Sequence, residues 1–568
     1  MSNISNAAAS EEKPERERLG FTTKLAYGAG DMGPALTANV LVFFLLYFFT
    51  QVAGLPAGLA STILMIGKVC DAINDPIVGI MSDRTRTRWG RRLPWMVFGA
   101  IPFSILFFLQ WIVPRFSDNN AVNNWWLFGY YVLIGILLNI AYTVVNLPYT
   151  ALTPELTQDY NERTSLNSFR FTFSLGGSIL ALVLARVIFN AYPGESGKQY
   201  LVLGLLSSLL ALVPLCWCFL GLQERGAQPI LGNSRKKAVG VVLTAIGIIT
   251  GIYGIAGIMP LTAPLVGATG EVDLAATVAL LFAVLITLFG LTLLFSTPES
   301  NLSDAASPQE RGKGEPPVRT NNPYLSLKEQ LRIVFSNKPF LYLIGIYLCS
   351  WLAVQLTASI LPYFVVNWMG LPDAAFPQVA LAVQGTAIVM LFVWKAISDR
   401  VGKKAVYALG TGFWIIAQTG LLFVQPGQIA LMYFLAVLAG VGVSVAYLIP
   451  WSMLPDVIDL DELRTEQRRE GIFYGFMVLL QKMGLALGLF LVGQALDWAG
   501  FIESIPGEPR PTQPDSAMLA IRIAIAPLPA LALVGGLVLA YFYPITREFH
   551  SEIRLQLQQR KQRHSILD

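Results

Sequence analysis

The chain has 568 residues, of which 54% are hydrophobic and 13% charged, and its mean hydropathy is +0.56. This composition is typical of a polytopic membrane protein and excludes an ordinary soluble domain. The formal net charge of +4 is small, and Lys and Arg gather in certain loops, so the basic balance bears on membrane orientation and gives no support to nucleic-acid binding.

Residues 1–24 mix Glu, Arg and Lys without an apolar core, which predicts a disordered cytoplasmic tail and no cleaved signal peptide. Beyond this tail the hydropathy pattern predicts about fourteen membrane-spanning helices and an all-α fold. The predicted spans are 32–52, 58–81, 93–113, 125–149, 170–191, 200–221, 238–259, 274–296, 339–366, 376–397, 404–424, 428–450, 471–496 and 518–543.

The second span carries charges that a lipid-facing helix should not have, in the run Lys68-Val-Cys-Asp71-Ala-Ile-Asn74-Asp75. Asp71, Asn74 and Asp75 lie at i, i+3 and i+4, so their oxygens share one helical face, with Lys68 one turn earlier. An intramembrane charge costs about 2.5 to 3.5 kcal/mol, so two carboxylates one turn apart need a cation, a proton or a basic partner. The pattern favours a hard-cation site over the alternative, a structural ion pair of Lys68 with Asp71.

Basic residues alternate between the loops, which fixes the orientation of the helices. The loop after the second span holds Arg84, Arg86, Arg88, Arg91 and Arg92, whereas the loop after the third span, at 117–120, is nearly uncharged. Carried along the chain, this alternation places both termini in the cytoplasm of a multi-pass protein of the cell membrane.

A weak internal repeat indicates two homologous six-helix halves, 25–225 and 324–545. Ser82-Asp83-Arg84 is echoed by Ser398-Asp399-Arg400, and the segment 154–163 by 455–464. The surplus between the halves, 226–323, is interpreted as an inserted transmembrane hairpin followed by a flexible cytoplasmic linker, and 546–568 as a cytoplasmic tail.

Neither redox nor enzymatic chemistry is indicated. The four cysteines lie in apolar runs and predict no disulfide framework or metal site. Both histidines, His550 and His564, lie in the C-terminal tail, and no cluster of nucleophile, base and orienting group occurs, so we expect no enzyme and no cofactor. The G-x-G-x-x-G spacing at 28–33 follows no strand and does not predict a dinucleotide site; its Asp31 is interpreted as a gate or cap near the cavity.

Several motifs occur in an order that identifies a family. They are Asp71-Ala-Ile-Asn74-Asp75-Pro76, the basic loop 82–92, Asn146-Leu-Pro148-Tyr149 with 150–163, and Pro455-Asp456-Val-Ile-Asp459. Together they resemble the glycoside-pentoside-hexuronide:cation symporters of the major facilitator superfamily, over about residues 21–225 and 324–555. The resemblance implies the major facilitator fold and alternating access.

Carried over from the melibiose-permease branch, the resemblance implies a cation site of Asp71, Asn74, Asp75 and the hydroxyl of Thr143. All four matching positions bear oxygen, which suits Na⁺, although the same carboxylates can instead carry a proton. Thr143 by itself has an alternative role, a hydroxyl bonded back to its own helix.

The implied substrate site is less complete. Two acidic positions that grip sugar hydroxyls in that branch are Ala35 and Asn146 here, and an aromatic position is Thr150. The matching positions that remain are Arg170, Tyr447, where the family has a tryptophan, and Lys482. Lys482 lies deep in an apolar helix and needs an acidic partner, such as Asp71, or a ligand. For Arg170 a structural pairing with Glu155 or Glu162 is equally open.

The cytoplasmic motifs predict an ion-pair latch between the two states of the transporter. Its expected members, together with Lys68 as a coupling group, are Asp83, Arg84, Glu155, Arg163, Asp399, Arg400 and Asp456.

The sequence thus predicts a monomeric secondary transporter that couples Na⁺ or H⁺ to the symport of a sugar or glycoside. Membrane lipid is its expected partner besides the substrate. A symporter of lysophospholipids or another amphiphile is the first alternative, because related animal proteins resemble the chain at 148–153 and 450–456. A non-transporting membrane receptor is the alternative of another class.

Overall fold

The computed structural model describes residues 19–157, 160–224, 227–258, 274–295, 327–466, 470–504 and 511–567. Within these ranges every regular element is helical, and the one β-bridge, between Thr87 and Gly90, is isolated. Twelve helical segments of the described residues are long and apolar enough to cross a membrane, and the predicted spans 93–113 and 238–259 are not among them. The predicted all-α polytopic membrane fold is confirmed.

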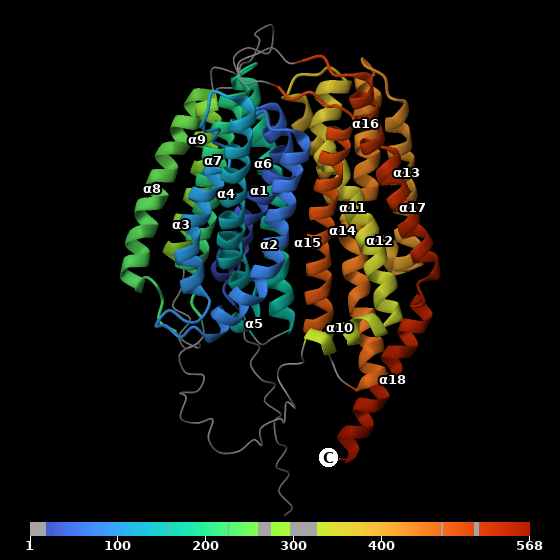
Figure 1. Ribbon diagram of the computed structural model, residues 1–568. Helices are drawn as coiled ribbons and strands as arrows, with labels where there is room; N and C mark the ends of the chain where they lie inside the picture. The colour runs from blue at the N-terminus through green and yellow to red at the C-terminus, as the bar shows by residue number, and fades with distance from the viewer. Residues whose placement is uncertain are drawn as a thin grey trace, which may run out of the picture.

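The first bundle is built from the N-terminal part of the chain, blue to teal in Figure 1. Its helices are α1 (Phe21–Gln51), α2 (Ala57–Arg84), α3 (Leu93–Leu109), α4 (Asn120–Thr150), α5 (Thr153–Leu156), α6 (Tyr160–Ala191) and α7 (Ser196–Gly221). The start of α4 is capped by the side chain of its N-cap residue. The Asn119 side chain accepts hydrogen bonds from the backbone N–H groups of Ala121 and Val122, which have no partner within α4.

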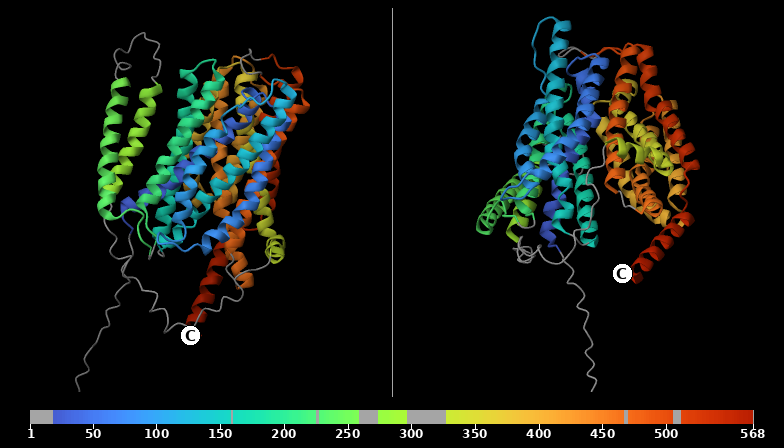
Figure 2. Two further views of the ribbon diagram at one scale, coloured as in Figure 1. Left: turned by 60° about the vertical axis from the view of Figure 1, so that its left-hand side comes forward. Right: turned by 60° about the horizontal axis from the view of Figure 1, so that its bottom comes forward.

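The second bundle is built from the C-terminal part of the chain, yellow to red in Figures 1 and 2. Its helices are α10 (Leu327–Ser336), α11 (Lys338–Tyr363), the π-helical turn η4 (Phe364–Trp368), α12 (Ala375–Val401), α13 (Lys403–Phe423), α14 (Ile429–Thr465), α15 (Glu470–Trp498), α16 (Asp515–Ile525), α17 (Pro527–Phe542) and α18 (Arg547–Leu567). The helix α18 extends beyond the bundle at its lower end.

Three boundaries differ from those predicted from hydropathy. α1 begins at Phe21, so the N-terminal tail is shorter than predicted, and α14 continues to Thr465, well past its apolar part. The last predicted span is divided at Ala526, because Pro527 has no N–H for the helical ladder and its ring opposes the preceding turn. Hydropathy reports only the length of an apolar segment. It therefore does not show that a helix extends beyond the bilayer, or that a helix is interrupted within it.

Two further helices lie in the segment that was predicted to be an inserted hairpin, α8 (Asn233–Ile258) and α9 (Leu274–Phe295), green in Figure 1. Their backbones approach closely: a Cβ atom added to Gly247 would lie 2.2 Å from the Thr287 hydroxyl, so only glycine fits there. α9 attaches the hairpin to the first bundle, where Phe289 stacks on Trp217 with ring centroids 6.1 Å apart. The predicted linker after α9, and the tail before residue 19, lie outside the described residues.

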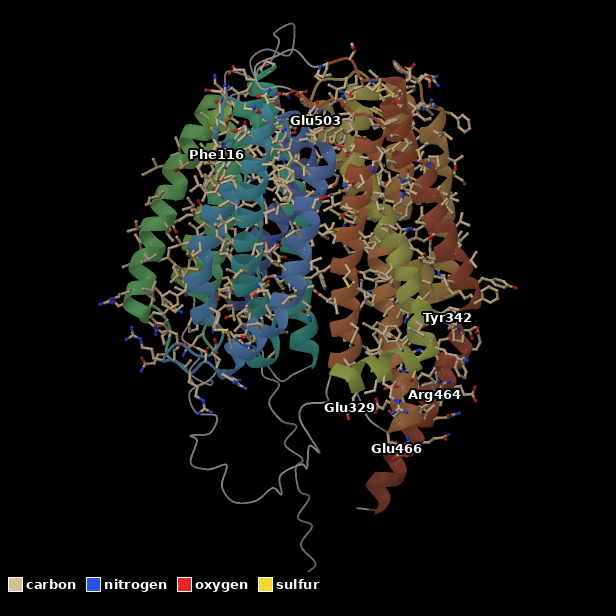
Figure 3. All side chains as sticks on the ribbon, in the orientation of Figure 1. Phe116, Glu329, Tyr342, Arg464, Glu466 and Glu503 are labelled. Atoms are coloured by element: carbon tan, nitrogen blue, oxygen red, sulfur yellow. The ribbon has the colours of Figure 1, made fainter. Side chains whose placement is uncertain are left out.

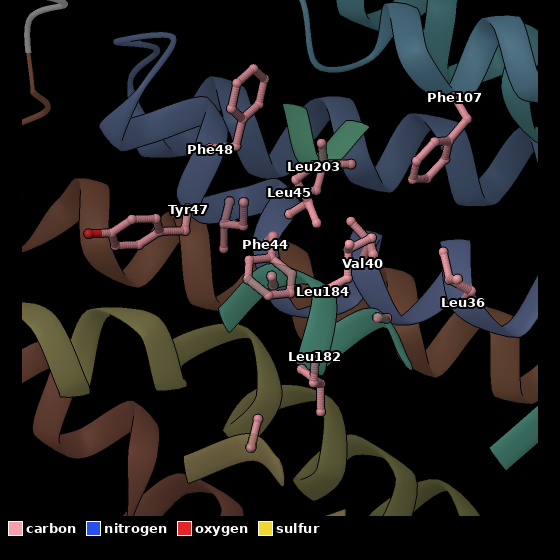
Figure 4. Close-up of a cluster of buried hydrophobic side chains, with 14 of the residues drawn as sticks. Leu36, Val40, Phe44, Leu45, Tyr47, Phe48, Phe107, Leu182, Leu184 and Leu203 are labelled. Atoms are coloured by element: carbon pink, nitrogen blue, oxygen red, sulfur yellow. The ribbon is translucent and has the colours of Figure 1, made fainter. Parts of the chain in front are cut away.

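The largest buried apolar cluster crosses from one bundle to the other. Figure 4 shows part of it around Phe44 of α1, with Leu182 and Leu184 of α6 nearby. Phe44 also contacts Phe376 of α12, with ring centroids 4.8 Å apart. Apolar packing therefore holds the two bundles together at this level.

Polar contacts also join the bundles at the end opposite α18, which we call the distal end. This distal seal consists of Tyr47 with Asp373, Thr50 with Tyr363, Gln51 with Ser504, the Ala57 N–H with Glu503, and Gln494 with the Gly58 carbonyl. Figure 3 labels Glu503 at this end and Glu466 at the opposite, proximal end.

The separation of the bundles increases toward the proximal end. Along the face of α15 that meets α2, a Cβ on Gly493 would lie 2.2 Å from the Ser61 side chain, whereas a Cβ on Gly475 would meet no described atom within 4 Å. Between them, Lys482 still reaches Asp75. The bundles are thus closed distally and joined in the middle, and α15 is uncovered at Gly475.

Candidate functional site

The two carboxylates of α2 meet a hydroxyl from α4 inside the first bundle. The Thr143 Oγ1 atom lies 3.0 Å from Asp71 Oδ1 and 3.0 Å from Asp75 Oδ1. Asp71 is buried, with 1% of its side chain exposed, whereas 25% of the Asp75 side chain is exposed. Helical spacing brings the two carboxylates to one face of α2, and the packing of α2 against α4 supplies the third oxygen.

Lys482 of α15 completes this group from the second bundle. Its Nζ atom lies 3.1 Å from Asp71 Oδ2 and also bonds Asp75 Oδ2. The ammonium group therefore interacts with the same carboxylates that a coupling cation would need. It links α2 to α15, and so joins the two bundles near the middle of both helices.

Lys68 lies at the edge of the same group. Its Nζ atom is 3.8 Å from Asp71 Oδ2 and donates a hydrogen bond to Asn139 Oδ1 at 3.2 Å. Two lysines thus face two aspartates, so their formal charges balance when all four are ionised. A bound cation would have to displace an ammonium group to keep this balance.

Asn74 behaves differently from its neighbours. Its Nδ2 atom is buried and has no hydrogen-bond partner among the described residues. The described contacts do not join Asn74 to Asp71 or Asp75, so its role as a cation ligand stays a prediction. Among the described residues, no group of three or more His, Cys, Asp and Glu side chains is placed to hold a metal ion, and the oxygens gathered here come from two carboxylates and a hydroxyl.

A second ion pair lies in the first bundle. Arg170 Nε of α6 is 3.1 Å from Asp31 Oδ2 of α1, and the guanidinium lies over the Tyr149 ring at 5.7 Å. The Tyr149 hydroxyl in turn donates to the Tyr27 carbonyl at 2.7 Å. Asp31 is a partner for Arg170 that the sequence did not predict.

The other predicted substrate residues occupy separate positions. Asn146 donates through Nδ2 to the Tyr142 hydroxyl at 3.3 Å, and its buried Oδ1 has no described partner. The Thr150 hydroxyl bonds back to the Leu147 carbonyl of its own helix. Tyr447 is on α14 of the second bundle and is 39% exposed. The described contacts do not gather these three side chains, and their roles stay predictions.

Comparison with known proteins identifies the family. The family described as MFS/sugar transport protein matches residues 26–242 and 234–547. The chain belongs to this MFS/sugar transport family. It is a multi-pass membrane transporter and not an enzyme.

Relatives of this MFS chain include an uncharacterized symporter of Synechocystis sp., 58% identical over 550 residues, which span 97% of this chain and 99% of the relative. A sodium-dependent lysophosphatidylcholine symporter of Danio rerio is 26% identical, over 96% of this chain and 90% of the relative. Among solved structures, the nucleoside transporter NupG aligns with a TM-score of 0.53 at 12% identity, over 92% of this chain and 98% of that one, which supports the fold alone.

The MFS chain's predicted cytoplasmic latch is described only in part. Lys403 Nζ lies 2.7 Å from both carboxylate oxygens of Asp456, so the second basic motif pairs with the second acidic segment within its own bundle. Arg84 and Arg400 are exposed. The side chains of the other expected members lie outside the described part of the chain: Asp83, Glu155, Arg163 and Asp399.

Three charged groups with structural roles were missed by the sequence reasoning. Glu224 accepts hydrogen bonds of 2.7 Å from three consecutive N–H groups, at residues 91 to 93, where α3 begins. Glu503 of the distal seal accepts from the Ala57 N–H at 3.2 Å, and His550 of α18 lies 3.2 Å from Asp459. Each partner is about 90 to 450 positions away in the chain, so no local spacing could have found them.

Proposed function

We propose that this chain is a cation-coupled symporter of the glycoside-pentoside-hexuronide branch that carries a sugar or glycoside. The observation that carries the proposal is the interaction of Lys482 with Asp71 and Asp75 across the two bundles. A lysine that bridges the moving halves at the two intramembrane carboxylates provides a charge switch between conformations.

The proposed coupling follows from charge balance. Without a cation, Lys482 together with Lys68 balances the two carboxylates, and Lys482 joins α2 to α15, which favours the distally sealed arrangement. A cation bound by Asp71, Asp75 and the Thr143 hydroxyl takes over this neutralisation and releases Lys482. The bundles then lose their central link and can rock around the substrate, so cation binding shifts the population toward the other state.

Sodium is the cation we propose, with a proton as the alternative. The gathered donors are oxygens, which suit an alkali cation, and the relative from Danio rerio is named as sodium-dependent. The proposed substrate is a small hydroxylated molecule. A galactoside bound by two carboxylates is disfavoured, because the two acidic positions of the melibiose-permease branch are Ala35 and Asn146 here. A lysophospholipid is the second candidate, favoured by the named substrate of that same relative.

We place the distal seal on the outer side of the cell membrane and both termini in the cytoplasm, as the basic loops favour. In this orientation the structure corresponds to an inward-facing state. The proposed working units are the two halves 25–225 and 324–545, with 226–323 as a peripheral insertion, and the proposed transporter is a monomer.

Uptake by purified protein in liposomes tests the proposal. An imposed inward Na⁺ gradient should stimulate uptake of the transported glycoside, whereas a pH gradient alone should not. The charge-neutral variant Asp75→Asn should lose this stimulation while retaining the fold. Full cation-stimulated uptake by Asp75→Asn would refute the coupling mechanism, and uptake of lysophosphatidylcholine in place of sugars would select the second candidate.

A further inference from the structure

Five aromatic side chains of the second bundle form a connected series that we call the aromatic ladder. Its members are Trp351, Tyr347, Tyr447, Trp451 and Tyr474. The ring centroids of Trp351 and Tyr447 are 5.6 Å apart, those of Tyr347 and Trp451 are 5.9 Å apart, and Trp451 stacks on Tyr474 at 6.2 Å. The ladder therefore joins α11, α14 and α15.

The ladder passes the depth of the cation-binding carboxylates. Cβ atoms on Gly484 and Gly488 of α15 would lie 3.4 Å from Leu348 and 3.3 Å from Leu352 of α11, which places Tyr347 beside the turn that carries Lys482 and Trp351 about one turn further toward the distal end. Tyr474 lies eight residues before Lys482 on α15, about 12 Å toward the proximal end at the usual helical rise. The aromatic ladder thus runs past the level of the carboxylates toward the proximal end.

Part of the ladder is accessible. Tyr447 is 39% exposed and Tyr474 is 37% exposed. Gly475, next to Tyr474, lies almost directly below Lys482 on the same face of α15, because seven residues are close to two helical turns. A Cβ there would meet no atom of the described residues within 4 Å, so these residues leave this face of α15 uncovered on the proximal side of Lys482.

The ladder also presents polar atoms without partners. The Nε1 atom of Trp351 is buried and has no hydrogen bond among the described residues. One turn along the same face of α11, Gln355 is 3% exposed and its buried Oε1 atom is likewise unpaired. Buried polar groups are normally hydrogen-bonded, so an unpaired donor and an unpaired acceptor one helical turn apart suit a ligand that both accepts and donates.

We propose that the aromatic ladder is the sugar-binding surface of this transporter, with Trp351 and Gln355 as its specificity-determining residues. The inference rests on the proposed glycoside transport and places recognition mainly on the second bundle. The C–H face of a pyranose ring is weakly electropositive and packs on the negative faces of Trp351 and Tyr447. A ring hydroxyl accepts from Trp351 Nε1 and donates to the Gln355 amide oxygen.

The same chemistry disfavours a phosphate-bearing headgroup. The aromatic faces by themselves would also attract a quaternary ammonium group, but the neutral indole N–H of Trp351 and the neutral amide of Gln355 supply no positive charge to balance a phosphate. The uncharged donor of Trp351 and the uncharged acceptor of Gln355, beside aromatic faces, match a neutral, hydroxylated ring. This surface also accounts for recognition without acids at positions 35 and 146.

Thermal stability of the purified full-length protein tests the aromatic ladder. The probes are methyl β-D-glucopyranoside, methyl β-D-xylopyranoside and 1-oleoyl-lysophosphatidylcholine, each with and without Na⁺, because a ligand of the native state raises the melting temperature. Trp351→Leu should weaken sugar binding at least about tenfold by removing the aromatic ring system, and Trp351→Phe about three- to tenfold by removing the N–H group with the five-membered ring while an aromatic face remains. Both variants should keep the Na⁺-induced shift, which also shows that they are folded.

Trp498→Leu is the matched control, since Trp498 is 82% exposed at the end of α15 and outside the ladder. A wild-type response to a sugar that is unchanged in Trp351→Leu would overturn the aromatic ladder and leave the proposed function standing. Absence of any sugar response in the wild type would overturn both. Loss of the lysophosphatidylcholine response alone in Trp351→Leu would overturn the assignment to a neutral sugar ring.

Discussion

Replacing Lys482 by glutamine should make cation binding tighter and coupling weaker. In the structure, the Lys482 ammonium lies 3.1 Å from Asp71 Oδ2 and also bonds Asp75, so a cation must compete with it. Lys482→Gln removes this competitor and leaves both carboxylates and the Thr143 hydroxyl in place. The variant also loses the charged link between α2 and α15.

The size of the effect follows from the geometry. At 3.1 Å and an effective dielectric constant of about 20, the attraction between Lys482 and Asp71 is about 5 kcal/mol. Desolvation offsets much of this, because Asp71 is buried and Lys482 is 21% exposed, which leaves a net contribution of roughly 1.5 to 3 kcal/mol. Since about 1.4 kcal/mol corresponds to a tenfold change, the Na⁺ dissociation constant should fall by about ten- to a hundredfold.

Titration of purified protein with Na⁺ at constant ionic strength, followed by calorimetry, measures this change. Lys404→Gln is the matched control, because Lys404 donates to the Tyr541 carbonyl at 2.6 Å in the second bundle, away from the carboxylates. Cation-driven uptake by Lys482→Gln should be lost even though its cation affinity rises. A folded variant whose Na⁺ affinity is unchanged or lower would show that Lys482 supports the site rather than competes for it.

Three further perturbations separate the other parts of the structure. Thr143→Val should weaken Na⁺ binding about ten- to a hundredfold in the same titration, since it removes a hydroxyl 3.0 Å from both carboxylates, whereas Thr150→Val should not, because its hydroxyl bonds only its own helix. Burial raises the pKa of Glu503, so its ionised form is disfavoured in the distal seal. Glu503→Gln should therefore have a higher melting temperature than the wild type at pH 7. This difference in melting temperature should shrink as the pH falls through the raised pKa toward the ordinary carboxyl range, because the wild-type carboxyl group becomes protonated. His550→Ala should expose α18 to trypsin several-fold faster than the control Gln556→Ala, because it removes the contact with Asp459 at 3.2 Å; equal cleavage rates would exclude a docking role.

Local patterns were enough to predict the helices and one side of the candidate cation site. Apolar length predicted where the chain crosses the membrane, because every backbone group in lipid must be satisfied within a helix. Helical periodicity likewise predicted that Asp71 and Asp75 share one face of α2. Boundaries were less predictable, since α14 continues through polar residues to Thr465 and Pro527 divides α16 from α17.

Contacts between distant segments were decided only by tertiary structure. Sequence analysis suggested Asp71 as one partner of Lys482, but it could not show that Lys482 also bonds Asp75, that Arg170 pairs with Asp31, or that five aromatic residues on three helices touch in series. The rings of the aromatic ladder looked like ordinary packing residues in a chain with 11% aromatic content.

The sequence by itself determined that this is a membrane-embedded helical protein with two energetically unfavourable carboxylates in its second span, because hydrophobic length and helical periodicity are local properties. The tertiary structure decided what neutralises those carboxylates and at which end the two bundles close. Those outcomes depend on which helix faces pack together. Asp75 and Lys482 are about 400 residues apart in the chain, and local sequence patterns do not show that they come into contact.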